Sequence, residues 1–336
     1  MNPPKPKTAS SSAAPPKSLV IPAPAKLNLF LHITGQRSDG YHLLQTAFQL
    51  LDYSDTVELQ LRDDNQILML ESLAEVNDQD NIVIKAAIAL RDFAEIHCSE
   101  LFAGQDNPQL SGVSIRILKK IPMGGGLGGG SSDAASTLLG LNQLWDLGLS
   151  LDQLATIGLK LGADVPVFVH GQSGFAEGVG EQLIALELPK RWFAVIKPPV
   201  SVPTAAIFAY AQLTRDTRPI RIAAFFDAQQ SPYSDSQIDG SLHNDCEPAA
   251  RKLYPAIDQA LLWFDQHLAS SGRTAKAKLT GTGACIFAGF DTQAQAQAVI
   301  DALPLATGMS GFIAQGTNRS IAHQALFNEY SLINSD

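Results

Sequence analysis

The chain has 336 residues, 45% of them apolar, which is enough for two domains with separate cores. Its 24 basic and 33 acidic residues give a net charge of −9, which argues against non-specific binding to nucleic acid. No run approaches the roughly 18 apolar residues of a membrane helix, and Cys98, Cys246 and Cys285 are too few for a disulfide framework. We therefore expect a cytoplasmic protein with no nucleic-acid or membrane partner.

The first part of the chain predicts a tail followed by strands and one helix. Residues 1–17 are rich in Pro, Ser, Ala and Lys and should form a disordered tail. Alternating apolar and polar residues then predict a strand at 25–33, with Lys26, Asn28 and His32 on one face. Further strands are expected at 45–51, 55–61 and 113–117, with a turn at 53–55 and a helix at 81–93.

The most informative segment is the glycine-rich run at 122–135, which reads Pro-Met-Gly-Gly-Gly-Leu-Gly-Gly-Gly-Ser-Ser-Asp-Ala-Ala. Glycine lets the backbone come close to a ligand, and a helix that begins there directs its free N–H groups at an anion. The run is not a Walker A loop, because Gly130 is followed by Ser131 where that motif needs lysine. A dinucleotide-binding fold is disfavoured, since the strand at 113–117 alternates and no acidic residue ends a strand about 20 residues on. A flexible linker is the other alternative, but linkers are seldom framed by a strand and a helix. The run therefore predicts a polyphosphate cradle of another kind.

Helices and strands alternate beyond the cradle. A helix capped by Ser131 or Ser132 is expected first, and its apolar face would comprise Ala134, Leu138, Leu141 and Trp145. The next helix begins with a capping box of Ser150 and Gln153 and ends near Gly162, before an apolar strand at 165–169. The second half predicts strands at 193–196, 277–280, 285–290 and 311–315, helices through Phe208, at 247–267 and at 292–303, and a polar irregular stretch at 214–241. This pattern predicts an α+β class with a mostly antiparallel second sheet.

Two residues are candidates for the chemistry of phosphoryl transfer from ATP to an alcohol. Besides a phosphate cradle and a metal, that reaction needs a cation near the transferring group and a residue that orients or deprotonates the hydroxyl. Lys26 is a candidate cation because its neighbours are apolar, although a solvated face of an edge strand would also explain it. Asp164 is a candidate base because it lies between a helix end and an apolar strand, although a simple turn aspartate would look the same.

Three blocks resemble, in order, the motifs of the GHMP small-molecule kinases: Ala25-Lys-Leu-Asn-Leu, Gly124-Gly-Gly-Leu-Gly-Gly-Gly-Ser-Ser and Gly281-Thr-Gly-Ala. The resemblance covers about residues 20–330 and also rests on Ile33-Thr-Gly-Gln-Arg-Ser-Asp-Gly-Tyr-His42, Gly162-Ala-Asp-Val-Pro166, Leu242-His-Asn-Asp-Cys-Glu-Pro248 and Lys278-Leu-Thr-Gly-Thr-Gly-Ala-Cys285. It implies a two-domain α+β fold. The N-terminal domain, at 18–178, would bind ATP and resemble domain 2 of ribosomal protein S5, and the C-terminal domain, at 179–331, would be ferredoxin-like with an antiparallel sheet.

The resemblance also implies a reaction and the residues that carry it. ATP with Mg²⁺ would donate the phosphoryl group. The acceptor would be a small molecule, a cytidine diphosphate-linked methylerythritol on the route to isoprenoid precursors, and its 2-hydroxyl would be phosphorylated. Asp164 would be the base, and Lys26 would hold it and the developing charge. The nucleotide would contact Asn81, Lys119, Pro122, Met123, Gly124, Gly125, Gly126, Leu127, Gly128, Gly129, Gly130, Ser131 and Ser132. The cytosine end would meet Tyr41, His42 and Phe208, with Asn28 and Thr204 as polar partners.

Three questions stay open at this point. The protein ligand of Mg²⁺ is either a serine hydroxyl at the end of the loop or absent, with phosphate and water coordinating the ion. The acceptor could be another alcohol such as homoserine or mevalonate, although the implied base-binding residues argue against it. A nucleotide-binding sensor without catalysis is the third reading, and the presence of both Lys26 and Asp164 counts against it.

Overall fold

The computed structural model describes residues 17–73, 77–97, 110–223, 225, 242–273 and 275–333, so the predicted tail lies outside the described residues apart from Lys17. The first half is built on a long antiparallel hairpin of β1 (Ser18–Gln36) and β2 (His42–Leu61). The remaining strands of this half extend the sheet from β2: β4 (Val113–Leu118), β3 (Ile67–Met69), β5 (Gly174–Glu177) and β6 (Gln182–Ala185).

Strand β2 runs without interruption through the segment where a turn at 53–55 was expected between strands at 45–51 and 55–61, so that prediction is wrong. The polar residues that suggested a turn have partners within the fold. Asp55 is fully buried, and its carboxylate accepts the backbone N–H groups of Lys120 and Ile121 at 2.5 and 2.7 Å. A carboxylate satisfied by backbone donors can stand within a buried strand.

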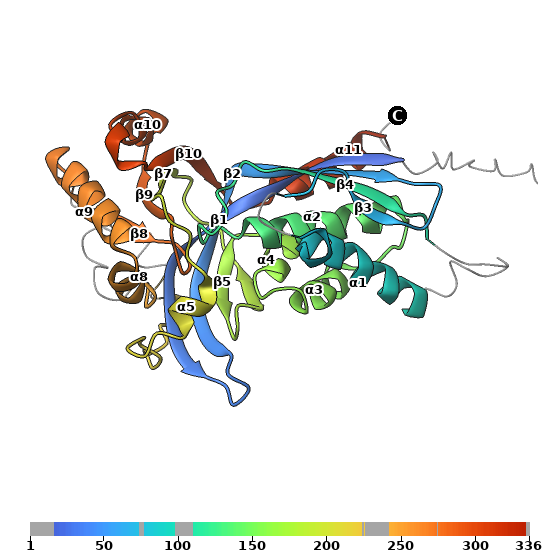
Figure 1. Ribbon diagram of the computed structural model, residues 1–336, viewed down its shortest axis with the longest axis horizontal. Coiled ribbons are helices and arrows are strands. Elements are labelled where there is room, and N and C mark those ends of the chain that lie inside the picture. Colours follow the sequence, from blue (N-terminus) through green and yellow to red (C-terminus); the bar gives the residue numbers. More distant parts are fainter. Residues whose placement is uncertain are drawn as a thin grey trace, which may run out of the picture.

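Four helices lie on one face of this sheet (Figure 1): α1 (Ile82–His97), α2 (Gly129–Leu144), α3 (Leu151–Leu159) and α4 (Val165–His170). Helix α2 packs directly on β1, and a Cβ at Gly140 would lie 2.3 Å from Ile21 Cδ1, so the glycine permits the close approach. The predicted apolar face of this helix is buried, which confirms it.

The two predicted helix starts in this half have different outcomes. The cap expected at Ser131 or Ser132 is wrong, because α2 begins at Gly129 after Gly128, whose φ of 73° is in the left-handed region that glycine tolerates. The capping box of Ser150 and Gln153 at the start of α3 is confirmed in both of its hydrogen bonds.

The second half contains an antiparallel sheet in the order β10 (Ser310–Thr317), β7 (Trp192–Lys197), β9 (Ile286–Phe290) and β8 (Lys278–Leu279), as expected. Strand β10 also pairs with β2 at Leu50 and Leu51, so one sheet runs through both halves. The described helices of this half include α5 (Thr204–Phe208), α8 (Glu247–Leu253), α9 (Pro255–Ser270) and α10 (Gln293–Asp301). A short 3₁₀ turn, η3 (Leu305–Thr307), follows α10, and another, η1 (Asp78–Asp80), precedes α1 in the first half. Helices α8, α9 and α10 lie at one end of the molecule and α1–α4 toward the other (Figure 1).

Two features of the second half differ from the sequence expectation. The single helix expected at 247–267 is wrong, because the helix breaks at Tyr254, where Pro255 begins α9 and has no N–H to continue α8. Helix α11 (Ile321–Ile333) was not predicted, and it returns to the first half, where Ala322 and Leu326 join the core formed by β1, β2 and the first helices.

Candidate active site

A cavity of about 660 Å³ lies between the glycine-rich loop, β1, β2 and the turn at 281–282. That volume is in the range of small-molecule sites. Tyr41, His42 and Ser132 are predicted site residues that lie outside its lining. The other predicted residues all line it: Lys26, Asn28, Asn81, Lys119, Pro122, Met123, Gly124, Gly125, Gly126, Leu127, Gly128, Gly129, Gly130, Ser131, Asp164, Thr204 and Phe208.

The glycine-rich loop is held against the second glycine turn. Gly124 and Gly126 have φ of 61° and 74°, and a Cβ at Gly126 would lie 2.2 Å from the carbonyl oxygen of Thr280. The carbonyl oxygens of Gly124 and Gly125 accept the N–H groups of Ala284 and Cys285, each at 3.0 Å. The first N–H groups of α2 have no partner inside that helix, so the loop and helix together present donors to an anion in the cavity.

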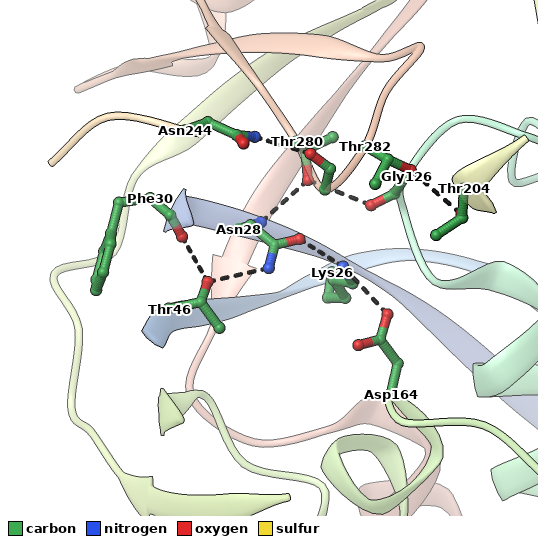
Figure 2. Close-up of polar contacts among 11 residues, drawn as sticks. Lys26, Asn28, Phe30, Thr46, Gly126, Asp164, Thr204, Asn244, Thr280 and Thr282 are labelled. Carbon is green, nitrogen blue, oxygen red and sulfur yellow. Dashed lines mark hydrogen bonds and ion pairs between the residues drawn. The ribbon is translucent and has the colours of Figure 1, made fainter. Parts of the chain in front are cut away.

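Lys26 and Asp164 form an ion pair in this cavity, with 3.3 Å between Nζ and Oδ2. The lysine side chain is only 4% exposed, which excludes the solvated edge strand, whereas the Asp164 side chain is 35% exposed and reaches the cavity. Figure 2 shows the two side chains pointing toward one another, with Nζ also donating to Asn28 Oδ1 at 2.5 Å. Asp164 is therefore more than a turn residue.

The secondary structure of the segment after Asp164 differs from the sequence expectation. The apolar strand expected at 165–169 is wrong, because these residues form α4, with Asp164 at its N-cap and Pro166 in its first turn. The helix is buried on every side, which is why all of these residues are apolar: Val165, Pro166, Val167, Phe168 and Val169. A short run that is apolar throughout fits a buried helix as well as a buried strand, so the sequence could not distinguish the two.

Lys119 lies between two buried carboxylates that the sequence did not single out. Its ammonium donates to Asp55 Oδ2, and to Asp133 Oδ2 at 2.7 Å. Burial by itself lowers the pKa of Lys119, but the two carboxylates outweigh it and the pKa is raised. Burial raises the pKa of Asp133 to about 7, because one ammonium cannot neutralise two buried carboxylates. The network therefore holds a carboxyl that titrates near neutral pH beside the start of α2.

Three buried polar atoms near the cradle have no hydrogen-bond partner among the described residues: Asn81 Nδ2, Ser132 Oγ and Asp133 Oδ1. Buried polar groups are rarely unsatisfied in a protein by itself, so such atoms fit a site that receives a polar ligand. They are an amide donor, a hydroxyl and a carboxyl oxygen, which suits the hydrogen-bonding edges of a nucleotide and an accompanying hard cation. Asp133 is the residue of this group that sequence reasoning missed.

The residues expected at the cytosine end form a second cluster. His42 stacks on Phe208 with ring centroids 4.8 Å apart, and Arg215 Nε donates to His42 Nε2 at 3.1 Å. Burial, followed by the charge of Arg215, lowers the pKa of His42, which favours the neutral imidazole. Because Arg215 can only donate, Nε2 is the acceptor, and a neutral imidazole then carries its proton on Nδ1. Tyr41, the residue before His42, is 64% exposed. Arg215 was missed because it lies in the stretch at 214–241 that showed no pattern, most of which is outside the described residues.

Thr204 and Asn28 both line the cavity and both contact the second glycine turn. Thr204 begins α5, and its Oγ1 lies 3.2 Å from Thr282 Oγ1 in the second glycine turn. Asn28 receives a hydrogen bond from Lys26 and donates Nδ2 to Thr46 Oγ1 at 3.0 Å, while its backbone N–H donates to Thr280 Oγ1 at 3.0 Å. Both residues thus join the cavity lining to the second glycine turn, Asn28 through Thr280 and Thr204 through Thr282.

Comparison with known proteins agrees with this geometry. The family model "GHMP kinases N terminal domain" matches residues 81–172, and "GHMP kinases C terminal" matches residues 235–307. A relative from Marinobacter nauticus, described as 4-diphosphocytidyl-2-C-methyl-D-erythritol kinase, is 47% identical over 309 residues, covering 92% of this chain and 97% of its own. The chain belongs to the GHMP kinase family. The two-domain α+β GHMP fold expected from the sequence is thereby confirmed.

Solved structures of GHMP kinases have the same fold. The crystal structure of a 4-(cytidine 5'-diphospho)-2C-methyl-D-erythritol kinase aligns with a TM-score of 0.63 and 28% identity, covering 89% of this chain and 99% of the other. A mevalonate kinase aligns with a TM-score of 0.62, covering 90% of this chain and 100% of the other, but it is only 16% identical, so it supports the fold alone.

Proposed function

We propose that the chain transfers the γ-phosphoryl group of ATP to the 2-hydroxyl of 4-diphosphocytidyl-2-C-methyl-D-erythritol, a step in the methylerythritol phosphate route to isoprenoid precursors. The observation that carries this proposal is the Lys26–Asp164 ion pair, which lies in the same cavity as the glycine-rich loop. The relative that is 47% identical and the similar crystal structure bear the name of this kinase.

Some residues around the cavity would bind the donor ATP, and others would act on the acceptor alcohol. The loop at 122–132 would bind the phosphates through backbone N–H groups, and Asn81 and Lys119 would contact the rest of the nucleotide. Asp164 would accept a hydrogen bond from the acceptor hydroxyl and take its proton as the O–P bond forms. Lys26 holds that carboxylate in place and would offset charge that develops on the transferring group. Because the transition state is loose, positioning by this pair would matter more than early proton removal.

ATP would enter as its magnesium complex, in which the cation neutralises charge on the phosphates. Among the described residues, no cluster of three or more His, Cys, Asp or Glu side chains could hold a metal ion. Mg²⁺ would therefore be held largely by phosphate and water, with Ser132 and Asp133 as the candidate side chains near the cradle.

The cluster of His42, Phe208 and Arg215 supports an acceptor that carries a base. A pyrimidine offers a flat face to aromatic rings and edges for directed hydrogen bonds. The neutral His42 would present Nδ1–H to a base carbonyl or ring nitrogen while Arg215 fixes the ring orientation. Asn28, Thr204 and Tyr41 would complete this side of the site. Homoserine and mevalonate carry no base that would use this cluster.

The proposal extends to domain roles and location. Residues 18–178 would form the ATP-binding domain, and residues 179–331 the C-terminal domain that supplies the second glycine turn and α5. Among the described residues, no helix is both long and apolar enough to cross a membrane. We propose a cytoplasmic enzyme whose partners are small molecules.

The direct test is to incubate the purified chain with ATP, Mg²⁺ and the cytidyl alcohol and to follow ADP and the phosphorylated product by mass spectrometry and ³¹P NMR. Phosphate on the 2-hydroxyl supports the proposal. Product with homoserine or mevalonate but not with the cytidyl alcohol would reject the assigned acceptor. Binding of ATP without any product would instead support a sensor.

A further inference from the structure

Thr46 lines the same cavity as the Lys26–Asp164 pair and is connected to Lys26 through Asn28 (Figure 2). It is a residue of β2 that is only 1% exposed, and it is fixed on both sides, by pairing with Leu31 of β1 and Ala176 of β5. Its side-chain oxygen has two partners: Phe30 O at 2.5 Å and Asn28 Nδ2 at 3.0 Å.

The direction of each hydrogen bond in the series Phe30–Thr46–Asn28–Lys26 is determined by the groups at its two ends. A carbonyl oxygen only accepts, so the single hydroxyl proton of Thr46 is donated to Phe30 O. The same oxygen can then only accept from Asn28, so the Asn28 atom that faces it must be the NH₂ group. At the other end the Lys26 ammonium only donates, so the Asn28 atom that faces it must be Oδ1. Both ends require the same orientation of the amide.

We propose that Thr46 is a positioning residue for phosphoryl transfer, because its hydroxyl fixes Asn28 in the one orientation that presents Oδ1 to the Lys26 ammonium. This inference rests on the proposed function, since it concerns the same ion pair. Without the hydroxyl, Nδ2 of Asn28 loses its acceptor and only the Lys26 end still holds the amide, so Asn28 would leave this position or turn NH₂ toward the ammonium. Two donors would then face one another in a site where all three side chains are nearly fully buried.

The expected consequence is displacement of the ammonium from its place beside Asp164. Nζ stands 3.3 Å from Asp164 Oδ2 and 5.2 Å from the centre of the Phe48 ring. These partners remain when Asn28 turns, but the 2.5 Å contact to Oδ1 does not. Because the glycine-rich loop makes no hydrogen bond to Thr46 among those described, nucleotide binding should be affected far less than the chemical step.

The test compares Thr46→Val with Thr46→Ser, which keeps the hydroxyl, and with Thr56→Val at a half-buried position farther along the same strand. Loss of a buried hydrogen bond to a charged group predicts that kcat falls about tenfold or more in Thr46→Val, with KM for ATP within about twofold of wild type. Thr46→Ser and Thr56→Val should stay within about twofold of wild type in both constants. Equal kcat in Thr46→Val and wild type, or a kcat loss that Thr46→Ser shares, would overturn the proposal.

A second readout does not depend on activity. The ¹⁵Nζ resonance of Lys26, assigned with Lys26→Ala, should shift in Thr46→Val and return to its wild-type position in Thr46→Ser. An unchanged resonance in Thr46→Val would contradict the role of Thr46 even if the wild type proved to have a different acceptor. If Thr46→Val does not fold, Thr46→Cys gives the same comparison, because a thiol is a weak donor and acceptor in a side chain of similar size. Failure to phosphorylate the cytidyl alcohol would overturn the proposed function and leave the resonance test standing.

Discussion

Replacing Asp133 with asparagine should change how the stability of the protein depends on pH. Above about pH 4 this residue is ionised in an unfolded chain, but in the folded protein its pKa is raised to about 7 by burial and by the charge of Asp55 beside it, against the opposing effect of Lys119. Between these two pH values the folded state binds more protons than the unfolded state. The stability that comes from the neutral carboxyl is therefore fully present below about pH 4 and is lost as the pH rises through about 7.

The size of the effect follows from the shift. A pKa raised by about 3 units corresponds to about 4 kcal/mol in total, of which about 3 kcal/mol is lost between pH 5 and pH 8.5. Asparagine does not titrate, and its Oδ1 can still accept from Lys119. Urea unfolding at both pH values should show wild type losing about 3 kcal/mol relative to Asp133→Asn as the pH rises. Asp152→Asn, at an exposed aspartate of α3, is the matched control and should show no such change. A difference between wild type and Asp133→Asn that is constant with pH, or that changes in the opposite sense, would refute this account of the network.

Further predictions concern the cradle, the base and the acceptor site. Asp164→Asn should lower kcat by about 10²-fold or more while KM for ATP changes little, as steady-state kinetics would show, and near wild-type turnover would reject its role. Gly126→Ala would place a Cβ 2.2 Å from a backbone carbonyl at a φ of 74°, so calorimetry should detect at least a tenfold weaker affinity for ATP, roughly the scale of a strained backbone position. Gly148→Ala, at a φ of 64° with nothing within 4 Å, is its control and should bind ATP normally. Phe208→Leu should raise KM for the cytidyl substrate about tenfold through loss of stacking, whereas Phe327→Leu on α11 should not, and equal effects would remove the stacking explanation.

The parts of the site that are local in sequence could be predicted, because glycine runs, caps and apolar spacing are readable over a few residues. The cradle at 122–132 and the placement of Lys26 on a strand are of this kind. Asp55 could not be recognised, because its partner Lys119 is 64 residues away and only the folded sheet brings them together. Thr46 likewise needs the register of β1 against β2 to place it beside Asn28.

Errors in the secondary structure have a common physical cause, which is tertiary packing that overrides local signals. The run after Asp164 is buried on all sides, so its apolar sequence does not distinguish a helix from a strand. The segment around Asp55 stays in a strand because backbone N–H groups satisfy its carboxylate. Helix α11 was missed because its role, to cover β1 of the first half, depends on a contact between the two ends of the chain.

Phosphorylation of the cytidyl alcohol by matched wild-type and Asp164→Asn proteins tests the central claim most directly. Each protein is given ATP, Mg²⁺ and either 4-diphosphocytidyl-2-C-methyl-D-erythritol or methylerythritol phosphate without the cytidyl group, and product is measured by ³¹P NMR. We predict rapid 2-phosphorylation of the cytidyl substrate by wild type, at least about 10²-fold less by Asp164→Asn, and little product from the acceptor without the base. Equal rates on both acceptors, or equal rates of the two proteins, would contradict the account.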